Sequence, residues 1–150
     1  MSQKARDIVE KIRYMTLATA SVDGKPWNSP VYTAHDENFN FYWISWRENQ
    51  HSKNLAENPR AFIVIFDSTV ESGREQGVYI DANVEMLEEK EAIEHGASFY
   101  YSRKNQEARS AEELMGDAPR RMYKAMPQKI WTNLWDAERK VDDRVEISLL

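Results

Sequence analysis

The alternation of apolar and polar positions predicts a chain built mainly from short strands. Apolar residues at helical spacing predict an amphipathic helix over residues 3–13. After it, runs of period two or of continuous apolar character predict strands separated by turn residues. These strands cover residues 15–21, 26–34, 39–46, 61–67, 77–87, 129–135 and 144–149.

Two further helices are expected between residues 87 and 129. Residues 88–103 are rich in charge and carry an apolar stripe of Ile93, Ala97 and Tyr100 or Tyr101. The sequence Ser110-Ala-Glu-Glu matches a capping box, which predicts a helix from residue 110 to about 124.

Turn residues define how the strands are joined. Asp23-Gly24 favours a tight hairpin turn, and Pro26 and Pro30 place the following strand at an edge or a bulge. Mostly antiparallel strands with short connections favour a small barrel, because closing the sheet removes its unpaired edges. The expected fold is mainly β with flanking helices (α+β), an antiparallel β-barrel of five to seven strands. Residues 1–150 are expected to form a single domain.

Composition narrows the class of protein. The net charge of −5 and the pI of about 5.3 argue against a nucleic-acid partner. The absence of cysteine excludes disulfides, thiolate zinc sites and cysteine nucleophiles, and it fits a reducing compartment. The sequence has no apolar signal region and no apolar run of the ~20 residues that span a bilayer. We therefore expect a soluble cytoplasmic protein.

The most informative stretch runs from His51 to Phe66. His51, Ser52 and Lys53 open a short helical turn that ends before Pro59, and an apolar strand follows at once. Free N–H groups at a helix start, beside a hydroxyl and an ammonium group, predict a phosphate site. No metal site is expected, because the remaining histidines have no second ligand nearby in sequence. No nucleophile elbow is present either, which is consistent with cofactor chemistry.

Several short motifs occur in one order along the first half of the chain. They are Leu17-Ala18-Thr19, Asp23-Gly24-Lys25-Pro26, the strand 39–45, Ser52-Lys53-Asn54-Leu55, Asn58-Pro59-Arg60 and Gly77-Val78-Tyr79. In this order the chain resembles the pyridoxamine 5′-phosphate oxidase-like superfamily of flavin-binding split barrels. The resemblance implies a homodimer that binds FMN in grooves at the subunit interface. Some relatives hold a deazaflavin or haem instead.

The resemblance also implies roles for individual residues. Ser52 and Lys53 would hold the FMN phosphate, with His51 alongside, and Gln76 and Gly77 would reach the flavin from the neighbouring subunit. The remaining cofactor-binding candidates come from the first three strands and the strand near residue 131: Thr16, Leu17, Ala18 and Thr19 around the ribityl chain and phosphate, Asn28, Ser29, Pro30 and Val31 at the ring edge, Trp43, Ile44 and Ser45 beneath the ring, and Trp131 at the dimer seam.

The chain departs from the phosphate-oxidase branch in its C-terminal half, where two helices are expected between strands, and in two motifs. It lacks an early arginine in the first strand, and its phosphate turn reads His-Ser-Lys instead of Ser-Arg-Lys. We therefore expect an FMN-dependent oxidoreductase that passes electrons from a reduced nicotinamide to a small acceptor through flavin N5, not a specific pyridoxamine phosphate oxidase. The alternatives are a flavin-binding protein without turnover (a cofactor carrier or a redox-responsive regulator), a deazaflavin or haem binder, and a cofactor-free β-barrel that acts through interactions. The pairs Arg103-Lys104 and Arg120-Arg121 are either solvated charges or a recognition site for an anionic substrate or a nicotinamide phosphate.

Overall fold

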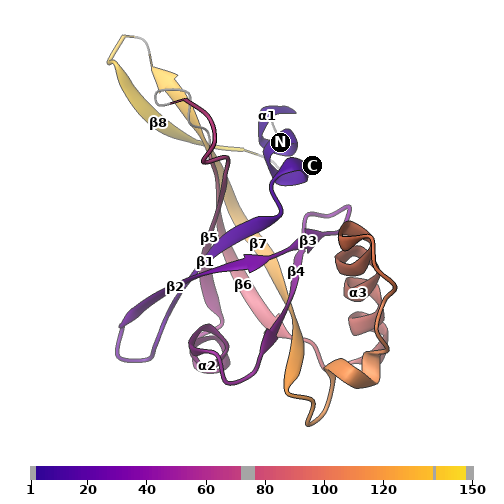
Figure 1. Ribbon diagram of the computed structural model, residues 1–150. Coiled ribbons are helices and arrows are strands. Elements are labelled where there is room, and N and C mark those ends of the chain that lie inside the picture. Colours follow the sequence, from indigo (N-terminus) through magenta and orange to yellow (C-terminus); the bar gives the residue numbers. More distant parts are fainter. Residues whose placement is uncertain (1–2, 72–76, 137, 148–150) are drawn as a thin grey trace.

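The computed structural model describes residues 3–71, 77–136 and 138–147. Three α-helices, one short 3-10 helix and eight strands occur in this part of the chain (Figure 1). In chain order they are α1 (Gln3–Lys11), β1 (Tyr14–Ala20), β2 (Pro26–Tyr32), β3 (Ala34–His35), β4 (Phe41–Trp46), α2 (Gln50–Glu57), β5 (Arg60–Phe66), β6 (Gly77–Met86), α3 (Lys90–Lys104), η1 (Ala111–Leu114), β7 (Arg120–Asp136) and β8 (Val141–Glu146).

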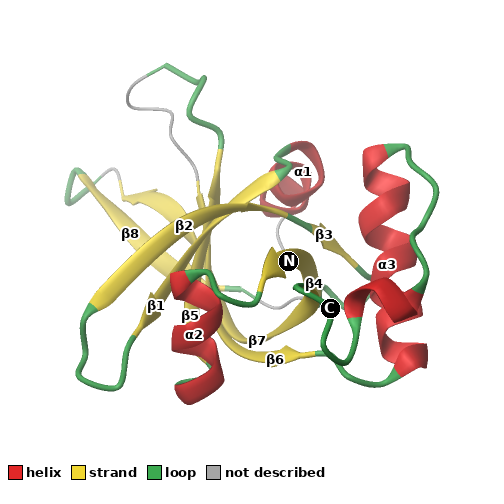
Figure 2. Ribbon diagram, turned by 60° about the horizontal axis from the view of Figure 1, so that its bottom comes forward, coloured by secondary structure: helices red, strands yellow, loops and turns green. Residues whose placement is uncertain are grey.

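The strands form one antiparallel sheet in the order β2-β1-β5-β6-β7-β4-β3, with β8 added beside β7. The strands curve around one apolar core, whereas α3 lies outside them, alongside β3 and β4 (Figures 1 and 2). This arrangement is the split-barrel, α+β fold that the sequence predicted.

The barrel is divided where the chain passes from β2 to β3. The predicted strand 26–34 is interrupted at Thr33, whose N–H donates to the Arg13 carbonyl at 2.9 Å. The Thr33 hydroxyl lies 3.1 Å from the Tyr42 carbonyl of β4. Thr33 thus redirects the chain from pairing with β1 to pairing with β4. The interruption also explains why the described sheet has eight strands instead of seven.

The expected edge position of the proline-containing strand is confirmed. β2 is the last strand on its side of the sheet and pairs only with β1. Pro26 and Pro30 lack an N–H group, so an edge strand tolerates them without losing a second ladder. The hairpin before β2 is also confirmed, because Gly24 adopts φ +82° and its N–H donates to the Ser21 carbonyl at 2.8 Å.

The helix predicted from residue 110 to about 124 is wrong. Only η1 forms there, Ser110 makes no side-chain cap, and Gly116 turns the chain with φ +58°. The segment from Arg120 onward forms the start of β7 because its backbone pairs with β4 along the register from Trp46–Arg120 to Phe41–Ala125. Long-range pairing has overridden a local helix signal.

β7 is therefore a 17-residue strand that begins nine residues before the predicted start at 129. Its register against β6 shifts between Asp81 and Ala82, whose partners are Lys129 and Pro127. Gln128 is the extra residue of this β-bulge, and Pro127 occupies the irregular position that a proline requires. With this bend, β7 pairs along its length with β4, then β6 and finally β8. The last predicted strand is observed as β8, which begins earlier, at Val141.

Two apolar clusters stabilise the fold. The larger one fills the barrel and includes Met15, Leu17, Ile63 and Ile80, each fully buried. The smaller one lies between β4 and α3, where Ile93, Ala97, Tyr100 and Tyr101 form the predicted stripe. Helix α3 approaches β4 closely at Gly96, where an added Cβ would lie 2.5 Å from Tyr42 Cδ1 and 2.8 Å from Met122 Sδ.

We expect Gly96→Ala to destabilise the protein by about 1–3 kcal/mol, because the methyl group overpacks the interface of α3 with β4. At an open helix position the same change would stabilise by up to ~1 kcal/mol. Urea unfolding measures the effect, with Ser98→Ala on the exposed side of α3 as a near-neutral control. In a Met122→Ala background the destabilisation caused by Gly96→Ala should be smaller. A stabilising effect of Gly96→Ala would contradict the close approach of α3 to β4.

Candidate functional site

The first turn of α2 presents backbone donors without partners. Asn49 precedes the helix and makes no side-chain cap. The N–H groups of Gln50, His51 and Ser52 make no hydrogen bond within the described part of the chain, as is usual for a first turn that lacks a cap. Gln50 and Lys53 are exposed, whereas His51 and Ser52 are buried. An anion could approach this turn only from the side of Gln50 and Lys53.

The predicted phosphate ligands Ser52 and Lys53 point in different directions. The Ser52 side chain is buried, and its hydroxyl donates to the Trp46 carbonyl at 3.0 Å. Lys53 is 54% exposed, and its Nζ lies 3.2 Å from the Glu48 carboxylate. A surface ion pair of this kind contributes little to stability, so Lys53 can readily exchange Glu48 for another anion. Lys53 is thus available to a ligand, while Ser52 offers its backbone N–H instead of its hydroxyl.

His51 connects two strands that do not pair with each other. Its Nε2 lies 2.8 Å from Ser45 Oγ on β4, and its Nδ1 lies 3.3 Å from Ser29 Oγ on β2. The Trp27 indole N–H donates to Ser29 Oγ at 2.9 Å, which leaves the Ser29 hydroxyl free to donate to Nδ1. His51 then donates from Nε2 to Ser45 as a neutral ring. Burial lowers the pKa of His51, which is consistent with this neutral form.

The predicted residues of β1 and β2 lie on two opposite faces of the sheet. Side chains alternate along a strand, and cross-strand partners share a face. Leu17, Thr19, Ser29 and Val31 face the barrel interior, whereas Thr16, Ala18, Asn28 and Pro30 face outward. Among the inward residues, Thr19 is joined to α2, because the Asn54 amide donates to its Oγ1 at 3.0 Å.

The predicted residues of β4 are divided in the same way. Trp43 is fully buried in the barrel and stacks on Tyr123 with ring centroids 5.4 Å apart. Ser45 shares that inward face and meets His51. Ile44 lies on the opposite face, toward α3. The structure therefore joins Ser45 to the start of α2 and places Ile44 elsewhere.

Trp131 lies on the outer face of the sheet, near the outward residues of β1. Its ring stacks on Phe62 at a centroid distance of 6.2 Å, and Phe62 is the cross-strand partner of Ala18. A shallow cavity of about 330 Å³ adjoins them, and Ala18, Thr19, Arg60 and Phe62 line it. Arg60 and Phe62 were not among the residues predicted for the site. The exposed positions that alternate along β5 were the signal that could have found them.

Gly77 is far from α2 within one copy of the chain. It pairs with Phe66 at one end of β5, whereas Arg60 at the other end follows α2 directly. Six residues of extended strand separate these ends by about 20 Å. Its suggested companion Gln76 lies outside the described residues. A ligand held at Lys53 could therefore meet Gly77 only from a second subunit.

Within residues 3–71, 77–136 and 138–147, no group of three or more His, Asp or Glu side chains is arranged to hold a metal ion. In the same ranges, none of the helices combines the length and apolar character needed to cross a membrane.

A family model described as pyridoxamine 5′-phosphate oxidase matches residues 1–134. The chain belongs to this family. No curated protein matches the chain.

Solved structures of this family's fold resemble the chain at low sequence identity. A candidate 5-nitroimidazole antibiotic resistance protein from Bacteroides thetaiotaomicron is 15% identical, with a TM-score of 0.72 over 88% of this chain and 82% of its own. A haem-binding protein from Mycobacterium smegmatis is 20% identical, with a TM-score of 0.73 over 96% of this chain and 57% of its own. An F420 reductase is 16% identical, with a TM-score of 0.63 over 87% of this chain and 98% of its own. These likenesses show the fold alone.

We expect the free energy of unfolding to decrease as the pH falls below about 6.5, the ordinary pKa of histidine. The unfolded chain then binds a proton at His51 that the folded chain does not, because burial lowers the pKa of His51 in the folded state. His51→Gln should flatten this slope between pH 7 and 5 in urea unfolding curves. His95→Gln, at a side chain that is 52% exposed, should keep it. An unchanged slope in His51→Gln would contradict a buried neutral ring at His51.

Proposed function

We propose that this protein is an FMN-dependent oxidoreductase that works as a homodimer. The observation that carries the proposal is the start of α2, where unpaired N–H groups lie beside the accessible Lys53 in a chain of the pyridoxamine 5′-phosphate oxidase family. A helix start with a nearby ammonium group is a suitable anchor for the phosphate of a flavin nucleotide.

The residues around this turn fit a phosphate group in part. The N–H groups of Gln50 and Ser52 and the Lys53 ammonium group would hold it, whereas the Ser52 hydroxyl is already bonded to Trp46. His51 would not contact the phosphate. Instead it fixes the turn by its bonds to Ser29 and Ser45. A rigid turn keeps the donors oriented before the ligand arrives, which lowers the entropic cost of binding.

Bound FMN would supply hydride and electron transfer at its own ring, so the protein needs no internal acid–base pair. The outward residues of β1 and β2, among them Thr16, Ala18 and Asn28, would line the path of the ribityl chain and the ring. We assign a reduced nicotinamide as the electron donor, a small molecule as the acceptor and the cytoplasm as the location.

One implication of the family resemblance and one observation support a homodimer. If Gly77 contributes to the flavin site, as the resemblance implies, a partner subunit would bring it near Lys53, because the two lie toward opposite ends of β5 within one chain. Large apolar side chains are also exposed on the outer face and on the hairpin of β7 and β8, as expected for an interface. They include Phe62, Phe66, Leu134, Trp135 and Val141.

A haem or deazaflavin binder is the second candidate function. It is supported by the similar folds of the haem-binding protein from Mycobacterium smegmatis and of the F420 reductase. The two candidate functions share one fold and differ in the bound cofactor, so identifying the cofactor distinguishes them directly.

Protein purified from its native host should carry a flavin absorption spectrum and release FMN on denaturation, identified by mass spectrometry. NADH or NADPH should then bleach the bound flavin in stopped-flow traces. A haem or deazaflavin spectrum would instead support the second candidate function. Bound FMN that neither nicotinamide reduces would indicate a flavin carrier without turnover.

Lys53→Gln should weaken FMN binding by about tenfold or more, because it removes a charge-assisted contact with the phosphate. Riboflavin lacks the phosphate, so its affinity should not change. Fluorescence titration measures both affinities, and Lys4→Gln on α1 is a control that removes one charge at another surface. Equal losses for FMN and riboflavin would exclude Lys53 from a phosphate site.

A further inference from the structure

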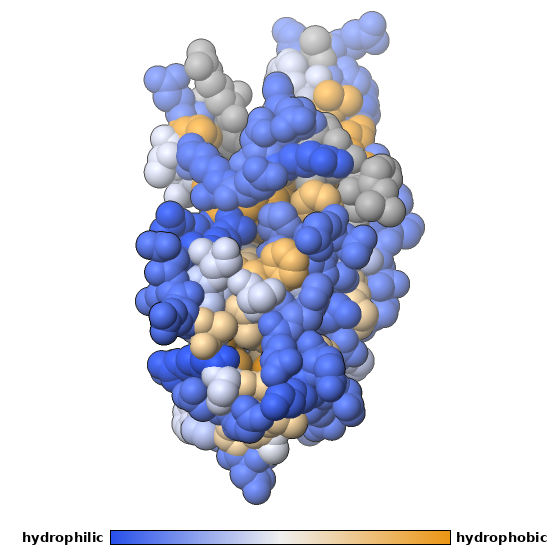
Figure 3. All heavy atoms as spheres, turned by 90° about the vertical axis from the view of Figure 1, so that its right-hand side faces the viewer, coloured by the Kyte–Doolittle hydropathy of each residue, from blue (hydrophilic) through white to orange (hydrophobic). Residues whose placement is uncertain are grey.

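A large cavity lies on the other side of β4 from His51. It has a volume of about 800 Å³, within the ~300–1,000 Å³ typical of small-molecule sites. Its walls come from α3, η1 and the adjoining ends of β4 and β7. Figure 3 views the molecule from this side, where paler and apolar residues lie between hydrophilic ones.

Three cations from separate segments line this cavity: Lys104 at the end of α3, Arg109 in the following loop and Arg120 at the start of β7. Glu113 is the acidic residue of the lining, and its carboxylate lies 3.7 Å from Arg109 Nη1. Lys104 and Arg120 make no ion pair with any described residue. The cavity thus carries an excess of positive charge in a chain whose net charge is −5.

Aromatic side chains form the other part of the walls. Trp46 is 51% exposed at the end of β4, and Tyr100 and Tyr101 are buried side chains of α3. Lys104 Nζ lies 5.3 Å from the Tyr100 ring centroid, within the range of a cation–π contact. Burial raises the pKa of Tyr100 to about 12, so its hydroxyl keeps its proton. A flat apolar ring would find stacking partners here, and an anionic group would find cations.

A buried arginine holds one wall in place. Arg121 is 4% exposed, and its guanidinium donates to the carbonyls of Leu114, Gly116 and Leu87 at 2.9, 2.9 and 3.1 Å. These bonds attach the segment after η1 to the end of β6. The cavity is therefore formed before a ligand binds, which favours affinity.

We propose that this cavity binds a small aromatic molecule that carries one anionic group, a carboxylate or a phosphate. The ring stacks on Trp46 beside the tyrosines that line the cavity, and the anionic group meets Arg120 and Lys104. The inference concerns binding at this cavity and does not depend on the proposed flavin site.

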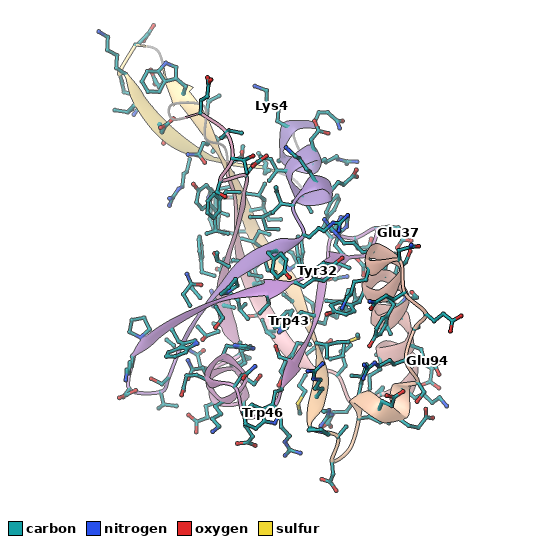
Figure 4. All side chains as sticks on the ribbon, in the orientation of Figure 1. Lys4, Tyr32, Glu37, Trp43, Trp46 and Glu94 are labelled. Atoms are coloured by element: carbon teal, nitrogen blue, oxygen red, sulfur yellow. The ribbon has the colours of Figure 1, made fainter. Side chains whose placement is uncertain are left out.

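Calorimetric titration of the full chain with 2-naphthoate and with its neutral analogue 2-naphthamide tests the proposal. The carboxylate should bind at least tenfold more tightly than the amide. Arg120→Gln and Lys104→Gln should each weaken naphthoate binding by about tenfold and leave the amide unchanged. Lys4→Gln is the matched control, because Lys4 lies on α1 at the end of the molecule away from Trp46 (Figure 4). A parallel titration with 1-naphthyl phosphate shows which anionic group is preferred, and saturable binding of either anion supports the proposal.

Three outcomes would overturn it: no saturable binding of either anion, equal affinity for naphthoate and naphthamide, or unchanged naphthoate affinity in Arg120→Gln with an unaltered urea midpoint. Lys53→Gln separates this site from the flavin site. It should leave naphthoate affinity unchanged, and a loss equal to that of Arg120→Gln would place the ligand at α2 instead. Failure of the protein to bind FMN would contradict the proposed function and would not affect the conclusion about naphthoate binding.

Discussion

The opening between β2 and β4 is the constraint on which the candidate site depends. Each of these strands has its backbone partners elsewhere, β2 with β1 and β4 with β7 and β3, so no ladder closes the barrel between them. Thr33 joins the two sides through the chain, and His51 joins them through its ring. Because His51 belongs to the first turn of α2, the bonds that close the opening also fix the donors of that turn.

The helical periodicity of α2 then places the buried structural residues and the solvent-accessible residues on different sides of the helix. Over α2 the buried positions are His51, Ser52, Asn54 and Leu55, which face the barrel, and Lys53 lies between them on the exposed side. With 3.6 residues per turn, Gln50, Lys53 and Glu57 recur on the exposed side of the helix, and Lys53 is the cation among them. Of the three residues that the motif suggested as phosphate ligands, His51 and Ser52 have side chains that are bonded within the fold. The third, Lys53, supplies the positive charge.

The fold class, the hairpin, the edge strand and the start of α2 could be predicted because each rests on local chemistry: Asp-Gly, proline without an N–H, and apolar periodicity. The start of β7 could not, since Arg120 and Arg121 become strand residues only by pairing with β4. Which of the predicted cofactor-binding residues share a face of the sheet could not be predicted either. The motif placed Leu17 and Ala18 together as neighbours, and the pleat of the strand turned them apart.

The same pleat explains how one short strand serves two regions. On β4, Ser45 faces His51, while Ile44 and Trp46 face the cavity beside α3. Trp46 belongs to both, because its carbonyl accepts the Ser52 hydroxyl and its side chain lines the cavity. A ligand that shifts the Trp46 backbone from the cavity side must therefore alter the bond that orients Ser52. Any energetic coupling between the start of α2 and the cavity would pass through this residue, and by linkage it would act equally in both directions.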